Sequence, residues 1–310
     1  MRALVFGAAG FVGKHLTEHL QGAGDTVYLA GIRTSGTPVE NEFAVDITDA
    51  AAVRRVIQEV EPDTVYHLAG IAFVPEAEGD FDRVLSINVG GTAHIIRECH
   101  ELNARVNFVF ASSAEVYGAI NAADLPVTES APARPKNNYS ASKQMAELIV
   151  ERYAREGRVQ CSIARPFNHI GPGQEPRFVA SNFALQLARI ARGEAAPIIR
   201  VGNLEARRDF SDVRDIVRAY RLLSTSSGGT FNLGSGKAYS IQYLLDVLIG
   251  ISGVEVTLET DPERMRGPEV AEVYTSLDKV QSLCGWSPVI PLERSLEDVY
   301  RCWFDRLASE

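Results

Sequence analysis

The sequence predicts an α/β protein built on a doubly wound, parallel β-sheet, with a smaller, mixed α/β domain at its C-terminal end. Short apolar segments suited to buried strands alternate with segments of helical periodicity through the first half of the chain. A glycine-rich turn separates the first predicted strand from the first predicted helix. Gly7, Ala69, Ser113 and Arg165 stand at or just past the ends of predicted strands, where ligands bind in sheets of this class. Together these observations favour a Rossmann-type, dinucleotide-binding domain.

We expect this Rossmann-type domain to cover residues 1–165, with returning segments near residues 209–234. The alternation of strands and helices is lost after Arg165, so residues 166–310 are predicted to form mainly a second, substrate-binding domain. No Gly/Ser-rich or Pro-rich linker separates the two halves. We therefore expect the second domain to pack tightly against the first.

The composition of the 310-residue chain is that of an ordinary globular protein, with 45% hydrophobic and 23% charged residues. The formal net charge of −9 argues against a nucleic-acid-binding surface, which needs clustered Lys and Arg. The four cysteines are far apart and form no CxxC pair, so we expect reduced thiols and no metal site. No bilayer-spanning apolar segment and no signal-peptide pattern is present. We expect a cytoplasmic protein with no membrane partner.

The first predicted strand, residues 2–6, leads into the turn Gly7-Ala-Ala-Gly10-Phe-Val-Gly13 and then into a helical segment through Leu20. Glycines here allow a tight turn and let a pyrophosphate approach the N–H groups of the helix N-terminus. A glycine trio alone is a weak signal, but its place between strand and helix favours a dinucleotide site over a plain turn. The expected cofactor contacts from this turn are Gly7, Gly10, Phe11, Val12 and Gly13.

The second predicted strand, residues 26–31, ends without the acidic residue that binds the ribose 2′-hydroxyl in NAD-preferring sites. Arg33 follows it and could neutralise a 2′-phosphate. We therefore expect NADPH as the cofactor, with NADH possible; a solvated loop arginine is the competing interpretation of Arg33.

Asp46 ends a short third strand that begins at Phe43. It is placed either to meet the adenine end of the cofactor or only to precede a helix. Thr48 is the predicted cap of that helix, residues 50–60.

A fourth strand, residues 64–68, ends at Ala69-Gly70, where small side chains would let the cofactor lie close to the backbone. The next helical segment, residues 81–100, carries Asn88. A fifth strand begins at Asn107, and a sixth covers residues 160–164. Both are short apolar runs of the kind buried in parallel sheets.

The predicted catalytic centre lies between the fifth and sixth strands. Ser112-Ser113 follows the fifth strand, and Tyr139-Ser-Ala-Ser-Lys143 opens a helical segment after a long loop. Residues four apart lie on the same face of a helix, and a cation beside a phenol lowers the pKa of that phenol. We expect Tyr139 to act as acid/base, Lys143 as its electrostatic partner and Ser113 as a hydrogen-bond donor to the reacting oxygen. Tyr-x-x-x-Lys also occurs by chance on amphipathic helices, and only the glycine turn gives it weight.

The second half offers candidates for binding a substrate. Residues 167–174 hold too many glycines and prolines for a helix or strand and would lie directly beyond the sixth strand. His169 in this segment is a structural or substrate-contacting residue, because no second His or Cys stands at metal-ligand spacing. Arg208 and Arg266 are predicted in loops, where they could hold a diphosphate by bidentate hydrogen bonds. Helices are expected at residues 178–192, 213–223 and 241–251, and strands at 198–201 and 230–233.

Taken together, the motifs resemble those of the extended short-chain dehydrogenase/reductases. The matching segments, spread over nearly the whole chain, are Gly7-x-x-Gly10-x-x-Gly13, Asp46-Ile47, His67-Leu-Ala-Gly70, Asn88-Val, Ser112-Ser113, Val116-Tyr117-Gly118, Tyr139-x-x-x-Lys143, Arg165-Pro-Phe-Asn168 and Arg208-Asp-Phe with Arg266. Three stretches, residues 73–77, 165–174 and 201–210, are most similar to the GDP-4-dehydro-6-deoxy-D-mannose reductases. That similarity implies reduction of the 4-keto group of GDP-4-keto-6-deoxy-mannose to GDP-D-rhamnose.

The resemblance also implies roles for individual residues and an assembly. Further cofactor contacts would come from the residues Ile47, Leu68, Asn88, Tyr139, Lys143 and Pro166. The nucleotide-sugar would be contacted by the residues Ser113, Asn168, Val179, Arg208 and Arg266. A homodimer is implied through the helix that starts at Tyr139 and the helix before it.

The sequence is also compatible with related activities. Glu115 stands where the related dehydratases have a base that removes the C5 proton, which leaves a dehydratase activity open. Gly171-Pro-Gly-Gln174 and Ala180-Ser-Asn182 replace the basic residues of GDP-mannose 4,6-dehydratases and favour the reductase. A nucleotide-sugar 4-epimerase and a non-catalytic dinucleotide-binding regulator are the remaining candidate functions.

Overall fold

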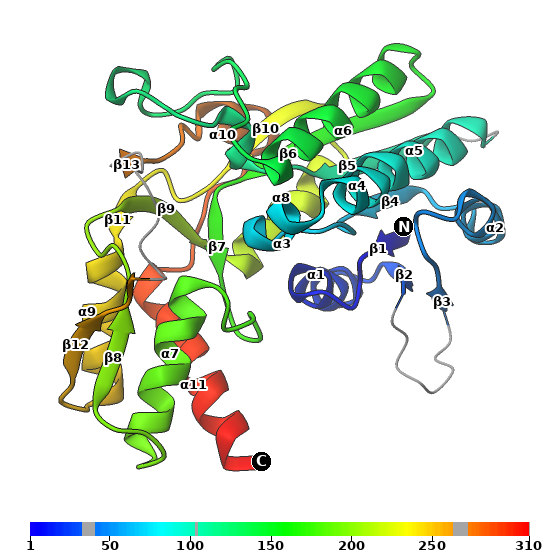
Figure 1. Cartoon of the computed structure of the whole chain (residues 1–310). Helices are drawn as coiled ribbons and strands as arrows, with labels where there is room; N and C mark the ends of the chain where they lie inside the picture. The colour runs from blue at the N-terminus through cyan, green and yellow to red at the C-terminus, as the bar shows by residue number, and fades with distance from the viewer. Residues whose placement is uncertain (33–40, 103–104, 263–271, 310) are drawn as a thin grey trace.

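The computed structural model describes residues 1–32, 41–102, 105–262 and 272–309. Arg33 and Arg266 lie outside these ranges. Figure 1 shows a twisted sheet flanked by helices, with a group of three long helices beside it.

Seven parallel strands form the central sheet in the order β10-β6-β5-β4-β1-β2-β3. From β1 the chain adds β2 and β3 on one side of the sheet and then β4, β5 and β6 on the other, as in Rossmann folds. Ligands bind at the switch point between β1 and β4. This sheet confirms the predicted fold class. Its strands are β1 (Arg2–Phe6), β2 (Thr26–Gly31), β3 (Glu42–Ala44), β4 (Thr64–His67), β5 (Val106–Ala111), β6 (Val159–Pro166) and β10 (Gly229–Leu233).

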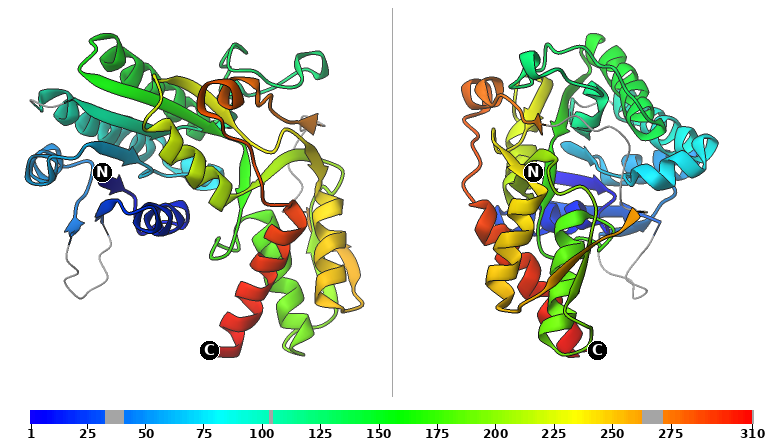
Figure 2. Two further views of the ribbon diagram at one scale, coloured as in Figure 1. Left: turned by 180° about the vertical axis from the view of Figure 1, so that it is seen from behind. Right: turned by 60° about the vertical axis from the view of Figure 1, so that its left-hand side comes forward.

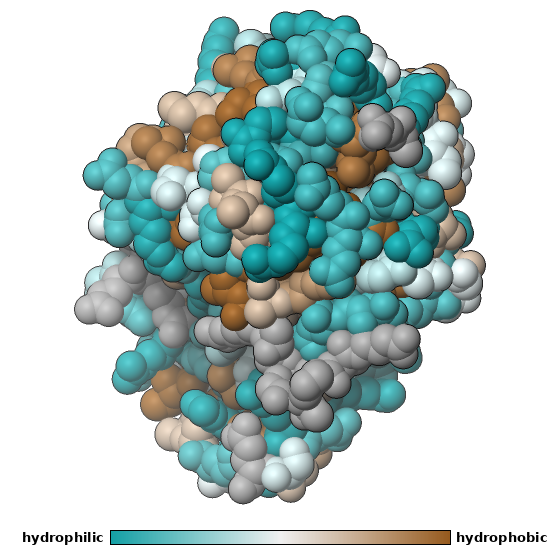
Figure 3. Space-filling view, turned by 90° about the vertical axis from the view of Figure 1, so that its right-hand side faces the viewer, coloured by the Kyte–Doolittle hydropathy of each residue, from teal (hydrophilic) through white to brown (hydrophobic). Residues whose placement is uncertain are grey.

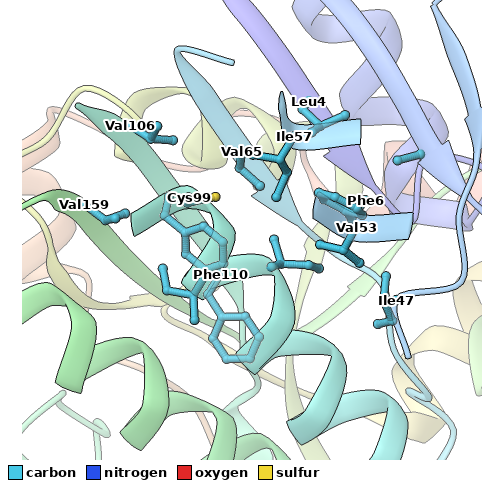
Figure 4. Packing of buried hydrophobic residues seen from close by; sticks show 14 of the residues in the cluster. Leu4, Phe6, Ile47, Val53, Ile57, Val65, Cys99, Val106, Phe110 and Val159 are labelled. Atoms are coloured by element: carbon cyan, nitrogen blue, oxygen red, sulfur yellow. The ribbon is translucent and has the colours of Figure 1, made fainter. Parts of the chain in front are cut away.

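Helices cover both faces of this sheet, and the inner strands β1, β4, β5 and β6 are accordingly buried along nearly their whole length. One face packs against α2, α5 and α6, and Figure 4 shows side chains of this core. The other face packs against α1, α8 and α10. The helices are α1 (Phe11–Gly22), α2 (Ala50–Val60), α5 (Thr92–Glu101), α6 (Asn138–Arg155), α8 (Val213–Leu223) and α10 (Asp278–Cys284).

Local sequence signals set several helix boundaries. Asn137 and Ser140 form a capping box that starts α6 directly before Tyr139. Asp49, not Thr48, caps α2, because the Asp49 carboxylate accepts from the amides of Ala51 and Ala52. The prediction for Thr48 is therefore wrong.

The predicted helix at residues 81–100 is a run of three helical segments. It comprises α4 (Phe81–Val84), a π-helical segment η1 (Leu85–Gly91) and α5. The short helix α3 (Val74–Gly79) precedes it. Asn88 lies in the middle of η1 and is buried; single π-helical turns of this kind are frequent at functional sites.

The C-terminal part has its own core, formed by α7 (Val179–Ala191), α9 (Ile241–Ser252) and α11 (Leu292–Ser309). Both views in Figure 2 show these three helices grouped away from the parallel sheet. Two small sheets complete this part. Their strands are β7 (Asn168–Ile170), β8 (Ile198–Val201), β9 (Arg207–Asp212), β11 (Ala238–Ser240), β12 (Thr257–Thr260) and β13 (Glu272–Val273).

Two predictions for this part are wrong. Residues 167–174 do contain a strand, because β7 pairs in parallel with β9 through the register Asn168 to Phe210. Arg208 likewise lies within β9 and not in a loop. Both short strands depend on partners distant in sequence, which local glycines and prolines do not reveal.

The chain crosses back to the first part after β9, where α8 and β10 join the Rossmann layers. The predicted domain boundary at residue 165 remains a prediction.

Among the described residues, no helix is long and apolar enough to cross a membrane. On the face in Figure 3, hydrophilic residues predominate and apolar residues lie in scattered patches.

Candidate active site

The glycine turn closes tightly against the end of β4. Gly7 has a φ of +88°, and a Cβ there would lie 2.7 Å from the backbone N of Ala69. A Cβ on Gly13 would lie 2.2 Å from the carbonyl oxygen of Gly7. Only glycine fits both positions, because each is in contact with backbone that has no room to move. The turn therefore brings β1, β4 and the start of α1 together at the switch point of the sheet.

The N-terminus of α1 has the features of an anion site. Gly10 is its N-cap, and no side chain caps the free N–H groups of the first turn. The 12-residue helix directs its positive dipole end to the carboxyl edge of the sheet. This combination of close backbone packing and uncapped amides fits the pyrophosphate of a dinucleotide. Phe11 and Val12 form the first turn, and the ring of Phe11 stacks on His169 with centroids 6.3 Å apart.

Asn88 joins the end of β4 to α6. Its Oδ1 accepts from the amide of Ile71 at 2.8 Å, and its Nδ2 donates to Ser142 Oγ at 2.9 Å. A Cβ placed on Gly70 would lie 2.8 Å from Asn88 Oδ1 and 3.8 Å from Lys143 Nζ. Since Gly70 follows Ala69, one continuous set of contacts leads from the glycine turn to Lys143.

Tyr139, Lys143 and Ser113 come together at the carboxyl end of β5, and all three are buried. Lys143 Nζ donates to the carbonyl oxygen of Ala111, the last residue of β5, at 2.7 Å. Ser113 is near enough to the Tyr139 phenol to lower its pKa. The amide of Glu115 donates to Ser113 Oγ at 3.1 Å, so the hydroxyl proton of Ser113 remains available to donate. The three side chains predicted as a group therefore share one site.

The expected effect of Lys143 on Tyr139 is wrong for this structure. Burial raises the pKa of Tyr139 to about 12; the hydrogen bond with Ser113 lowers that pKa, and the Glu115 charge raises it further. Burial likewise lowers the pKa of Lys143 to about 8. Removal of both groups from water is the largest cause of each shift. Lys143 Nζ meanwhile donates its hydrogen bond to the Ala111 carbonyl.

Asp46, Ile47 and Leu68, which were predicted to contact the cofactor, differ in their burial and contacts. Asp46 accepts from the amide and hydroxyl of Thr48, and these hydrogen bonds lower its pKa. Asp46 is exposed at the end of the β3 segment, and Ile47 is buried against Gly91. Leu68 continues the backbone pairing of β4 with β1, its amide donating to the Phe6 carbonyl at 2.9 Å.

Three of the predicted substrate residues lie on elements that follow β6. Pro166, predicted to contact the cofactor, ends β6, and Asn168 begins β7 with its side chain exposed. Val179 is the first residue of α7. Arg208 is half-buried on β9, where its Nη1 donates to the carbonyl of Arg207 at 2.8 Å. No group of three or more metal-ligating side chains occurs within the described ranges.

Sequence reasoning missed Glu147, which is fully buried one helical turn after Lys143. The Glu147 carboxylate pairs with Arg165 of β6 at 2.6 Å. The spacing of four residues on one helix face was the available signal. A buried carboxylate at that place could have been inferred to face the lysine.

Comparisons with known proteins agree with this geometry. The profile of the NAD dependent epimerase/dehydratase family matches residues 3–234. The chain is 36% identical over 311 residues to GDP-6-deoxy-D-mannose reductase of Pseudomonas aeruginosa, covering 100% of this chain and 99% of that protein. It is 28% identical to GDP-6-deoxy-D-talose 4-dehydrogenase of Aggregatibacter actinomycetemcomitans, covering 92% of both.

Among solved structures, RMD from Pseudomonas aeruginosa complexed with NADPH is similar with a TM-score of 0.89 and 34% identity, covering 99% of this chain and 100% of that one. These similarities confirm the resemblance to the extended short-chain dehydrogenase/reductases. The profile match covers most of the chain, and the Pseudomonas aeruginosa relative matches its full length. The chain therefore belongs to the NAD dependent epimerase/dehydratase family.

Proposed function

We propose that this protein is an NAD(P)H-dependent oxidoreductase that reduces the 4-keto group of GDP-4-keto-6-deoxy-mannose to give GDP-D-rhamnose. The observation that carries the proposal is the convergence of Tyr139, Ser113 and Lys143 beside the glycine turn. The substrate class is supported by the similarity to a GDP-6-deoxy-D-mannose reductase along the whole chain.

The cofactor is NADPH, with NADH as the possible substitute. The uncapped N-terminus of α1 and the close approach of Gly7 to Ala69 fit its pyrophosphate. A relative of known structure binds NADPH. Lys143 would hold the nicotinamide ribose, since its Nζ lies close to Gly70. Bound NADPH would supply the hydride that C4 of the sugar receives.

Tyr139 gives the proton that completes the reduction. As C4 gains a hydride, negative charge develops on the former carbonyl oxygen, and the Tyr139 phenol protonates it. Ser113 donates a hydrogen bond to the same oxygen, because its Oγ already accepts from the amide of Glu115. The product is the C4 alcohol, and the phenolate then regains a proton from solvent.

The raised pKa of Tyr139 suits the direction of this reaction. With a pKa of about 12, the phenol is protonated throughout the neutral range. A reductase needs the protonated form at the start of each turnover, whereas an enzyme that begins by oxidising an alcohol needs the phenolate.

Asn168, Val179 and Arg208 are the proposed contacts to the nucleotide-sugar, with Arg208 placed near its phosphates. Arg266 is proposed for the same role, and Arg33 for the 2′-phosphate of the cofactor. Glu115 is exposed beside the site, and its charge raises the pKa of Tyr139. It is the proposed base should a dehydratase activity accompany the reductase.

The decisive experiment supplies GDP-4-keto-6-deoxy-mannose with NADPH or NADH and follows absorbance at 340 nm. We expect one equivalent of NADPH to be oxidised for each sugar reduced, with NMR identifying GDP-D-rhamnose. GDP-6-deoxy-D-talose would mean that the ring binds turned over against the same residues. A protein that carries tightly bound, recycled NAD would instead be an epimerase or dehydratase. Cofactor binding without turnover would favour a regulator.

The protein is further proposed to be a cytoplasmic homodimer that pairs through α5 and α6. In support, α6 exposes Met145 and Leu148, with 42% and 56% of their surface accessible. Apolar side chains adjacent on one helix face are typical of a helix-packing interface. Leu148→Glu should convert the dimer to a monomer in sedimentation velocity. Leu283→Glu is the matched control, because Leu283 is equally exposed on α10; a monomeric wild type would refute the assembly.

A further inference from the structure

A buried ion pair lies directly behind the proposed catalytic residues. Arg165 of β6 donates through Nε and Nη2 to both oxygens of Glu147 on α6, at 2.9 and 2.6 Å. Glu147 is 0% and Arg165 6% exposed. A bidentate pair of this kind is geometrically specific, and burying it is costly unless every polar atom is satisfied. The proton and hydride transfers of the proposed reaction make no use of it.

The pair fixes both ends of the segment that carries Ser113. At one end, Ser112 Oγ donates to Glu147 Oε1. At the other end, Arg165 Nη1 donates to the hydroxyl of Tyr117 at 3.0 Å. Tyr117 in turn donates to Asn232 Oδ1 of β10 at 2.6 Å. Ser113 and the 3₁₀ turn that follows it are therefore held at both ends by hydrogen bonds to the same ion pair.

The same carboxylate faces Lys143. Glu147 and Lys143 are four residues apart on α6, and the charge of Glu147 raises the pKa of Lys143 against the effect of burial. His67 of β4 also lies near this lysine, but burial and the Lys143 charge hold its pKa at about 3, so it is neutral. Tyr139, on the same helix, is protonated. Glu147 is thus the described carboxylate that acts on Lys143.

We propose that Glu147 and Arg165 form a positioning pair for the reaction. Their hydrogen bonds hold Ser113 in register with Tyr139, and the Glu147 carboxylate favours the charged form of Lys143. The consequence for the reaction rate rests on the proposed function, whereas the effect on Lys143 does not. If the pair had only a structural role, replacing it would change the stability of the fold and leave the pKa of Lys143 unaltered.

The direct test is the titration of Lys143 by NMR. The sequence has five lysines, Lys14, Lys136, Lys143, Lys237 and Lys279, so ¹³Cε-labelled lysine gives a simple spectrum in which Lys143→Arg assigns the signal. In Glu147→Gln the pKa of Lys143 should fall by about one unit or more. Glu151→Gln is the matched control, because Glu151 lies one turn further along α6 in an exposed pair with Arg155. In Glu151→Gln, Lys143 should titrate as in the wild type.

Arg165→Lys separates the two parts of the proposal. Lysine keeps the positive charge but loses the planar fork, so the hydrogen bonds to Glu147 and Tyr117 cannot all form. Lys143 should then titrate as in the wild type. The kcat for the ketone should nevertheless fall by about tenfold or more, with KM nearly unchanged, because Ser113 is displaced from the reacting oxygen.

Glu147→Gln leaves Arg165 as a lone buried charge and can fail to fold. The double variant Glu147→Gln/Arg165→Gln removes both charges and should fold and show the lowered pKa of Lys143. A wild-type titration of Lys143 in this double variant would overturn the proposal, as would failure of all three variants to fold. Absence of turnover in the wild type would refute the proposed function alone, since the NMR titration needs no substrate.

Discussion

Replacing Lys143 with methionine should stabilise the ligand-free protein while abolishing its activity. Lys143 is buried on α6, and burial lowers its pKa from 10.5 to about 8. Holding its charge in the folded state therefore costs free energy that an apolar side chain of similar length avoids. The expected gain comes from a residue proposed to act in the reaction, so stability and activity should move in opposite directions.

The magnitude follows from the two pKa values. A shift from 10.5 to about 8 makes the charged lysine about 3 kcal/mol unfavourable at pH 7. Loss of the hydrogen bond from Lys143 to the Ala111 carbonyl costs about 1 kcal/mol in return. The net gain is about 2 kcal/mol, which should raise the midpoint of thermal unfolding by about 4 °C for a chain of this size.

The sign of the pH dependence is fixed by the lowered pKa. The unfolded chain binds the lysine proton more tightly than the folded one, so the penalty is fully present below pH 8 and disappears as the pH rises through 10.5. At pH 9.5 the penalty has fallen to about 1 kcal/mol. The advantage of Lys143→Met over the wild type should therefore shrink by about 2 kcal/mol between pH 7 and pH 9.5.

Urea and thermal unfolding followed by circular dichroism, without nucleotide, measure this difference. Lys136→Met is the control, because Lys136 is exposed just before α6 and should change stability by less than about 0.5 kcal/mol. A variant less stable than the wild type at pH 7, or an advantage that does not change with pH, would refute the reasoning. Either result would mean that Lys143 is not a desolvated cation.

The remaining predictions concern the reaction and the cofactor. Tyr139→Phe should lower kcat by about 10²–10⁴-fold with KM within a small factor, because only the proton donor is lost; steady-state kinetics with near-wild-type turnover would remove Tyr139 from the mechanism. Ser113→Ala should lower kcat by about 10²-fold, measured in the same assay. Gly13→Ala should weaken NADPH binding by at least about tenfold in fluorescence titration, since its Cβ would meet the Gly7 carbonyl at 2.2 Å; unchanged affinity would exclude this turn from the cofactor site. Arg208→Gln should raise KM for the nucleotide-sugar with kcat nearly constant, and a kcat effect alone would argue against phosphate binding.

Much of the Rossmann part was predictable because its signals are local. The strands of the first part are short apolar runs, and the helix at Ala50–Val60 has the predicted bounds. Such patterns depend on burial of each segment against a sheet, which the sequence records directly. The separation of Tyr139 and Lys143 by four residues likewise fixed their common helix face.

The predictions that were wrong concern contacts between distant segments. β7 pairs with β9 across some forty residues of chain, and β9 also pairs with β11 and β13, all distant in sequence. β7 is only three residues long and β9 is rich in charged residues, so neither has the apolar pattern of a buried strand. The cap of α2 was misplaced by one residue, since Thr48 and Asp49 are both good capping residues and only the geometry distinguishes them.

The sequence by itself determined most of the order of strands and helices and the glycine turn, and it singled out the side chains proposed to react, because these follow from spacing and residue type. The tertiary structure alone decided the protonation of that site. Burial of Tyr139 and Lys143 sets their pKa values more strongly than their mutual spacing does. Desolvation depends on all the residues packed around a group, and the ion pair of Glu147 with Arg165 joins segments that only the folded chain brings together.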